Sequence, residues 1–535
     1  MSNRNRLLPL LFAPLLVVAG CSGGAGAGGP EVTTGPPQRG GQLTVLEDAS
    51  FSGSWPTGLD PATNTTGGAN LPQMSAIYGG LFAITANDDG SGAKVEPNQA
   101  ERYELADGGA TVRITLREGI KFSDGTPLDA EAVVFNIRRN LDSPCTCRPV
   151  WPPLAQGGIA TEGARTVVLR FTRPYAAVIN AFPVANVNWI ASPTALQKLG
   201  PDQFRIQPVG AGPFTVVSNK LNSELVLERN PTYFKDGLPY LDRLTFKSIG
   251  GDQPAYQALL AGQAQAYEGL TTTPLLNQAK ANSALTVTPQ PPTSPYVVQL
   301  NTKIAPFNDE KAREAIYAAT DFEAVAKGLF AGQYPVSQMF TGPGGLFHHE
   351  KVNGYPAFDL ERAKQLVREL GGLTVKLGTL STYVAEQVNT ALQTQWRAAG
   401  IDVEIETYQL STLVQQFNGG TWQAMLQTAG AWDPAAGVGV GFRFLSTSPF
   451  SGVVDPELDK LLNDAAGTID AAQREQLYVK AGERIADRAY APFGLAFAPA
   501  NLAVKGVHGP GLTTKIPPVI VNSSILWDKV WREQR

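Results

Sequence analysis

The N-terminal segment constrains this 535-residue chain most, because it carries the features of a secretion signal. Two arginines precede an apolar run over residues 7–18, and small residues lead from there to Cys21. A basic start, an apolar core of about a dozen residues and a small-residue cleavage site are typical of a signal peptide. The run is shorter than the ~20 residues that span a bilayer. We therefore expect residues 1–20 to be removed and the remainder to fold outside the cytoplasm.

Cys21 directly follows Ala-Gly, which indicates a bacterial lipoprotein signal. We expect cleavage before Cys21 and a lipid on its sulfur. Residues 21–40 are rich in glycine and have few apolar side chains to bury, so we expect a flexible tether. An ordinary signal peptide with an incidental cysteine is the alternative. The expected location is the extracytoplasmic face of the cell membrane, with the lipid as anchor.

Length and charge indicate a multidomain protein that does not bind nucleic acid. The chain without its signal is too long for one hydrophobic core, so we expect at least two domains. The formal net charge is −4 at pH 7, and long runs of Lys or Arg are absent from the sequence. Nucleic acid is therefore not an expected partner. After the signal, no run of ~18 consecutive apolar residues predicts a membrane span.

Cysteine and histidine usage gives little sign of a metal site. Cys145 and Cys147 are the two remaining cysteines, separated by one residue. An oxidising compartment favours a disulfide between them, with free thiols or a pair of ligands as alternatives. The histidine pair at 348–349 is far from both in sequence and is expected in a solvated loop. We predict no metal and no cofactor.

Residue patterns predict a mixed α/β chain. Alternating or apolar runs predict strands over 42–46, 111–117, 166–171 and 224–229. In the second half, a strand over 373–380 precedes a helix with an apolar face from Val384 to Trp396. Gly400 is suited to end that helix, and Val403 begins another alternating run. Strand, helix and strand in this spacing indicate a βαβ unit. Further helices are expected over 310–328, 359–370, 456–465 and 470–488.

Several segments, in order along the chain, resemble one known family. They include LREGIKFSDGTPLDAEAV at 116–133, LERNPTYF at 227–234, NTKIAPFND at 301–309 and DPELDKLL at 455–462. Together they resemble the family 5 extracellular solute-binding proteins, the dipeptide- and oligopeptide-binding components of ABC importers. A single such motif would be weak evidence, whereas an ordered set behind a lipoprotein signal is strong.

The resemblance implies an α/β, two-lobed fold of the type II periplasmic-binding-protein class, with an extra subdomain in the first lobe. Lobe I would comprise 41–295, with the inserted subdomain at about 75–205. Lobe II would comprise 296–499, and 500–535 would return to lobe I. The implied function is a lipid-anchored, monomeric, non-enzymatic receptor. It would capture oligopeptides between hinged lobes and deliver them to a membrane permease.

The resemblance also suggests where a ligand would be held. Peptide-binding members use an Asp in a G-W-x-x-D-x-x-D-P stretch to pair with the ligand's α-ammonium. The corresponding stretch here, GAWDP at 430–434, is shorter and has no clear counterpart of that Asp. Trp432 is expected to wall the cleft, the alternative being a core position. Asp433 either substitutes for the missing Asp or forms a structural turn.

Three more residues complete the expected ligand site. Phe51 and Trp55 are large aromatic residues in a polar loop after the first strand, where they either face a cleft or pack locally. Arg443 is a candidate for a bidentate contact with a ligand carboxylate, with an exposed surface position as the alternative.

Three alternatives to a peptide receptor stay open. The same kind of receptor could take a non-peptide solute, such as an oligosaccharide, an opine-like compound, haem or a metal chelate, because the ammonium-binding Asp is missing. A receptor-like envelope regulator would keep the fold without feeding transport. An extracellular hydrolase is disfavoured, because the chain after the signal has no nucleophile motif.

Overall fold

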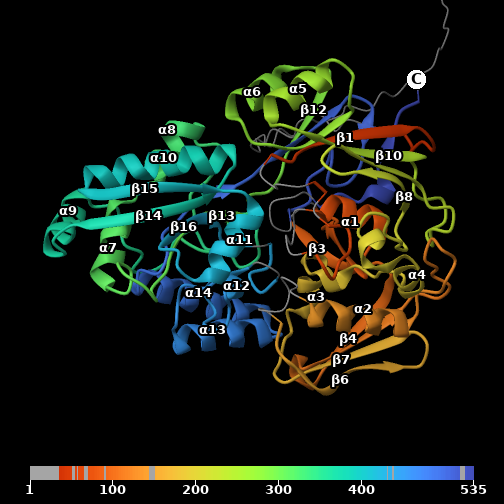
Figure 1. Ribbon diagram of the computed structural model, residues 1–535, viewed down its shortest axis with the longest axis horizontal. Helices are drawn as coiled ribbons and strands as arrows, with labels where there is room; N and C mark the ends of the chain where they lie inside the picture. The colour runs from red at the N-terminus through yellow and green to blue at the C-terminus, as the bar shows by residue number, and fades with distance from the viewer. Residues whose placement is uncertain are drawn as a thin grey trace, which may run out of the picture. The chain divides into compact units, whose positions relative to one another are not determined.

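Two large β-sheets organise the chain from Gln38 to Arg535, which forms one compact unit. The computed structural model describes residues 35–50, 55–56, 58–64, 70–89, 92–143, 151–430, 432–436, 439–518 and 524–534 (Figure 1). The expected signal peptide and most of the expected tether lie outside these residues. None of the described helices is long and apolar enough to cross a membrane.

The first sheet has seven strands drawn from both ends of the chain. In spatial order they are β12 (Leu285–Pro289), β18 (Ala500–Val504), β11 (Ala266–Leu270), β1 (Gln42–Asp48), β10 (Arg243–Ile249), β9 (Glu224–Arg229) and β8 (Phe214–Lys220). Strand β1 runs parallel to both β10 and β11. Helices α5 (Asp252–Leu260) and α6 (Thr273–Ala281) pack against β11 and β12. The sheet therefore joins the N-terminal strand to a strand near the C-terminus.

The second sheet has five strands and contains the expected βαβ unit. In spatial order they are β15 (Ile401–Tyr408), β14 (Leu373–Leu380), β16 (Ala424–Thr428), β13 (Ser294–Leu300) and β17 (Phe493–Phe497). Strands β14 and β15 are parallel, and α10 (Tyr383–Ala398) connects them. Gly400 has φ +86°, a conformation that side chains disfavour. The prediction of a strand–helix–strand unit here is confirmed.

A separate four-stranded sheet lies within the range 75–205. In spatial order it contains β4 (Ala100–Ala106), β5 (Thr111–Leu116), β7 (Thr166–Phe171) and β6 (Leu154–Glu162). Helix α2 (Ala130–Asp142) packs on β6 and β7, and Asp129 caps it by accepting a bond from the backbone N–H of Ala132. The domain limits proposed from the sequence stay a prediction.

The remaining elements are short strands and helices around these sheets. In the first half they are α1 (Leu71–Tyr78), β2 (Phe82–Ala86), β3 (Ala93–Pro97), η2 (Asp107–Gly109), α3 (Val178–Ala181), η3 (Phe182–Val184), η4 (Asn186–Asn188) and α4 (Pro193–Phe204). In the second half they are α9 (Leu360–Glu369), α11 (Leu410–Gly419), α12 (Val440–Phe444), α13 (Pro456–Gly467), α14 (Ala471–Asp487), β19 (Val507–His508), η5 (Trp527–Lys529) and β20 (Trp531–Arg532).

The α/β class is confirmed, but one expected helix is wrong. The single helix predicted over 310–328 is two helices, α7 (Glu310–Ala319) and α8 (Phe322–Phe330). The break lies at Thr320 and Asp321, and the Asp321 carboxylate accepts a bond from the backbone N–H of Ala324. A side chain that caps a new N-terminus competes with continuation of the preceding helix. Apolar periodicity alone did not reveal this break.

We expect the C-terminal strand β18 to be essential for stability. Leu502 is 0% exposed and lies opposite Tyr267 of β11 and Val287 of β12. Leu502→Ala should lower the free energy of unfolding by about 2–5 kcal/mol, because it leaves a cavity in the hydrophobic cluster that Leu502 forms with residues of α5 and α6 on one face of the sheet. Chemical denaturation measures the change, and Leu221→Ala, at an exposed position, is the control. Equal stabilities of the two variants would contradict a core role for β18.

Candidate functional site

Glu47, near the end of β1, is a buried carboxylate held by two neutral donors. It accepts one hydrogen bond from Trp55 Nε1 at 2.9 Å and another from Gln73 Nε2 at 2.6 Å, both on Oε2. Burial raises the pKa of Glu47 from its ordinary value of 4.5 to about 7, although these two bonds act in the opposite direction. Carboxyl ends of parallel strands are where open α/β sheets place their ligands. The sequence pattern predicts a strand that ends at residue 46 and assigns no role to Glu47.

Trp55, expected to face a cleft or pack locally, is buried and donates its indole N–H to Glu47. It therefore supports the carboxylate on β1. Phe51 lies outside the described residues, as do Cys21, Cys145 and Cys147. Their expected roles stay predictions.

Asp433 is a buried carboxylate that is already neutralised. Arg474 of α14 donates to both of its oxygens, at 2.6 and 2.9 Å, and the Asn180 side chain donates to Oδ2 at 2.8 Å. Burial opposes the charged form of Arg474, but the adjacent Asp433 carboxylate raises the pKa of Arg474 overall. The backbone N–H of Ala435 bonds to Asp433 Oδ1 as well. The expectation that Asp433 takes a ligand ammonium stays a prediction, and its carboxylate has these partners already.

Trp432 lies at a junction between distant parts of the chain. Its side chain is 3% exposed, and it belongs to a hydrophobic cluster made up mainly of residues before 250. Ala435, Phe442 and Ala466 join the same cluster. Nearby, the Tyr175 hydroxyl donates to the carbonyl of Ala435 at 3.0 Å. The segment around Trp432 therefore packs against the part of the chain that carries the first sheet.

Arg443, in α12, is a buried cation. It is 7% exposed, and its guanidinium lies over the rings of Phe442 and Phe417, at 5.1 and 5.9 Å from their centres. Within the part of the chain that the structure describes, no carboxylate forms an ion pair with Arg443, and its buried Nε has no hydrogen-bond partner. Burial lowers the pKa of Arg443 to about 9, so the guanidinium keeps its charge at neutral pH. The sequence-based alternative of an exposed surface arginine is wrong.

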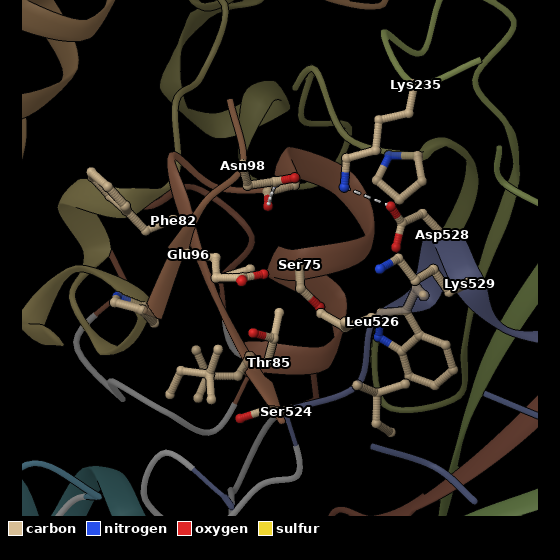
Figure 2. Close-up of a pocket in the computed structure, with 18 of the residues that line it drawn as sticks. Ser75, Phe82, Thr85, Glu96, Asn98, Lys235, Ser524, Leu526, Asp528 and Lys529 are labelled. Carbon is tan, nitrogen blue, oxygen red and sulfur yellow. Dashed lines mark hydrogen bonds and ion pairs between the residues drawn. The ribbon is translucent and has the colours of Figure 1, made fainter. Parts of the chain in front are cut away.

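A cavity elsewhere lies apart from these residues. It measures about 870 Å³, including space open to solvent, between α1, the β2–β3 hairpin and residues 524–529 (Figure 2). Lys235 and Asp528 form an ion pair at 2.8 Å on one side of it. Trp55, Trp432, Asp433 and Arg443 do not line it.

Two of the described histidines pair with single carboxylates, whereas His348 Nδ1 lies 2.8 Å from the carbonyl of Thr341. His349 lies 2.8 Å from Glu475, and His508 lies 3.0 Å from Glu533. Across the described ranges, no group of three or more His, Cys, Asp or Glu side chains is placed to hold a metal ion.

Sequence reasoning missed Glu47, Gln73, Arg474 and Asn180. Asp433 and Arg474 are 41 residues apart, and Asn180 is 253 residues from Asp433. Each is a polar residue in an ordinary local context, so only the fold reveals its partner. A signal existed for Glu47 alone, as an acidic residue that directly follows the buried run of β1.

Stability of the ligand-free protein should depend on pH through Glu47. A carboxyl whose pKa is raised in the folded state stabilises the fold below its ordinary pKa, and this contribution is lost as pH rises through 7. Relative to wild type, Glu47→Gln should therefore gain about 3 kcal/mol between pH 4.5 and pH 8. Denaturation at several pH values measures this difference, with the exposed Glu228→Gln as control. A difference independent of pH would contradict the prediction.

Comparison with known proteins places this chain in a family. Residues 94–448 match the sequence model of the bacterial extracellular solute-binding proteins, family 5. The glutathione-binding protein GsiB of Salmonella paratyphi A is 29% identical over 338 residues, 62% of this chain and 63% of the relative's length. The di/tripeptide-binding protein 1 of Pseudomonas aeruginosa is 25% identical, over 80% of this chain and 84% of its own.

Solved structures share the fold over nearly the whole chain. AgaA of A. tumefacien R10, in complex with agropinic acid, has a TM-score of 0.79 at 20% identity and covers 92% of this chain and 99% of its own. DppA of Helicobacter pylori, in complex with the peptide STSA, has a TM-score of 0.77 at 21% identity, with coverage of 93% and 99%. The predicted type II periplasmic-binding-protein fold is confirmed. Because the family match spans well over half of the chain, the chain belongs to the bacterial extracellular solute-binding proteins of family 5.

Proposed function

We propose that this chain is a lipid-anchored receptor of an ABC importer that captures short peptides or related small solutes and delivers them to a membrane permease. Family membership supports the receptor class. Similar proteins are named for binding glutathione and di- or tripeptides, and similar structures hold a peptide or agropinic acid. These ligands are small molecules that carry carboxylate groups. The proposed receptor binds its solute between lobe I (41–295 with 500–535) and lobe II (296–499), without catalysing a reaction.

Arg443 is the observation that carries the proposed ligand class. An isolated buried charge is costly unless an opposite charge and hydrogen bonds compensate for it. The guanidinium of Arg443 has no acidic partner among the residues described, and aromatic rings cover part of it. A carboxylate on the solute would supply the missing charge in a bidentate geometry that suits arginine. The proposed solute therefore carries at least one carboxylate.

Contacts between the two proposed lobes support capture by closure. Asn180 donates to Asp433, and the Tyr175 hydroxyl donates to the carbonyl of Ala435. The N–H of Ala177 donates to the carbonyl of Ala466 at 3.0 Å. A ligand that contacts both lobes would favour the same closed arrangement and shift the equilibrium toward it.

The function is tested first by identifying what the protein carries. A soluble form with Cys21 replaced is purified and denatured, and the released small molecules are identified by mass spectrometry. A series of short peptides supports a peptide receptor. One carboxylated non-peptide compound would change the solute class. A protein that releases nothing, and that no peptide or opine stabilises in a thermal-shift screen, would argue against a solute receptor.

Arg443→Gln should weaken binding of the identified solute by a factor of ~30 or more, about 2 kcal/mol, because a desolvated ion pair is lost. Ligand-free stability should not fall, since the substitution removes an uncompensated buried charge. Calorimetric titration and denaturation measure the two effects. The exposed Arg362→Gln is the matched control. A large loss of ligand-free stability with unchanged affinity would assign Arg443 to the core.

Lipid anchoring is expected to depend on Cys21 alone. In cells fed an azide-bearing palmitate analogue, the wild-type chain should be labelled and should fractionate with membranes. Cys21→Ser should lose the label and the membrane association, because the acceptor sulfur is gone. Cys145→Ser is the control and should keep both. Labelling of the Cys21→Ser chain would contradict the proposed anchor.

A further inference from the structure

A receptor for peptides needs a group that recognises the α-ammonium. The expected group, the Asp433 carboxylate, already has partners within the protein. Asp433 is neutralised by Arg474 and bonded by Asn180. A second cation there would compete with a buried ion pair in which one guanidinium nitrogen of Arg474 bonds both carboxylate oxygens. A ligand ammonium would therefore need a buried carboxylate elsewhere in the fold.

Glu47 and Glu268 form such a pair in the first sheet. They lie on the adjacent parallel strands β1 and β11, and the strand register places them opposite each other. Residues paired in this way point to the same face of a sheet. Their exposed fractions are 7% and 6%. Two carboxyl groups are thus buried side by side near the carboxyl ends of parallel strands.

The surroundings of Glu47 supply acceptors in excess of donors. Its Oε2 takes both available bonds, from Trp55 and Gln73, and these donors are neutral. Its Oε1, and also Oε1 of Gln73, are buried oxygens with no hydrogen-bond partner in the described part of the chain. In the same part of the chain, no Lys or Arg forms an ion pair with Glu47. A primary ammonium has three donors and one positive charge. It could therefore supply the hydrogen bonds that these two oxygens lack, and the cation that Glu47 lacks, within the described ranges.

The end of β1 also lies beside the second lobe. Ser50, just beyond β1, accepts a hydrogen bond on its carbonyl from the side chain of Gln409, at the start of α11, at 3.3 Å. Glu47 therefore lies on a strand whose end reaches the proposed closing surface, with Glu268 on the adjacent strand. A ligand held between the lobes could present one end to this strand and its carboxylate to Arg443 of lobe II.

We infer that Glu47 and Glu268, with Gln73, form the subsite of lobe I that binds the α-ammonium of a short peptide. This inference rests on the proposed function. The receptor then recognises the two charged ends of a peptide with opposite lobes, the ammonium in lobe I and the carboxylate in lobe II. Asp433 instead joins the proposed lobes through Asn180, while Arg474 of its own lobe orients its carboxylate.

The inference is tested by calorimetric titration with trialanine and with N-acetyl-trialanine, which has no ammonium. Wild-type protein should bind trialanine at least 10-fold more tightly than the acetylated peptide. Glu47→Gln and Glu268→Gln keep the side-chain shape and should each weaken trialanine binding at least 10-fold, with little effect on the acetylated peptide. Glu228→Gln, an exposed glutamate of the same sheet, is the matched control.

Three results overturn the inference. Equal affinity of the wild type for both peptides would remove the ammonium from recognition. Undiminished trialanine binding by both variants would place its partner elsewhere, while leaving the proposed function intact. No binding of either peptide by the wild type would reject the subsite together with the peptide form of the proposed function. Mass spectrometry of the released solutes tests the receptor function independently of this result.

A crystal structure of the wild-type protein with trialanine gives a second measurement that does not depend on the variants folding. The peptide nitrogen should lie about 3 Å from a carboxylate oxygen of Glu47 or Glu268. A nitrogen bound at Asp433, or exposed to solvent, would overturn the inference.

Discussion

The arrangement of this protein depends on two neighbouring crossings of the chain between its large sheets. The chain leaves the first sheet after β12 and enters the second at β13, and it returns from β17 to β18. Strands β12 and β18 are antiparallel partners, as are β13 and β17. Between them, the N–H of Gln290 donates to the carbonyl of Pro499 at 2.9 Å. The crossings thus form one antiparallel ribbon, so a bend in one segment must be accompanied by a bend in the other.

A ribbon of this kind restricts the relative motion of two bodies to a few backbone torsions, which is how hinges work in other two-domain proteins. In the proposed closure, contacts far from the ribbon would then set how much of the population is closed. Asn180 and Tyr175 contribute two such contacts, to Asp433 and to the carbonyl of Ala435. Asp433 is oriented for this by Arg474, so a buried ion pair within the proposed lobe II positions an acceptor for a donor of the proposed lobe I. The proposed ligand would add its own contacts to this set.

Sequence patterns predicted what is local and missed what is distant. Strand β14 and helix α10 depend on residues within a few positions of each other, and their pattern is strong. The break at Asp321 is also local. It depends on a capping bond at the start of α8, which the apolar periodicity that predicts a single helix does not reveal. The partnership of Asp433 with Arg474 depends on the packing of α14 against a loop 41 residues earlier. No spacing rule brings those two residues together, and the family resemblance left Asp433 as either a ligand contact or a structural turn.

Within the described part of the fold, some buried charged side chains are paired with an opposite charge, and others are not. Asp433 and Arg474 are buried yet paired, so each compensates the charge of the other. Arg443 and Glu47 are equally buried, without an opposite charge among the described residues. Natural sequences tolerate such local conflicts mainly where binding requires them. If one ligand supplies both missing charges, the free energy that destabilises the empty protein is recovered on binding. The affinity then depends on the ligand having two charged ends at the right separation, which is a criterion of length as well as of charge.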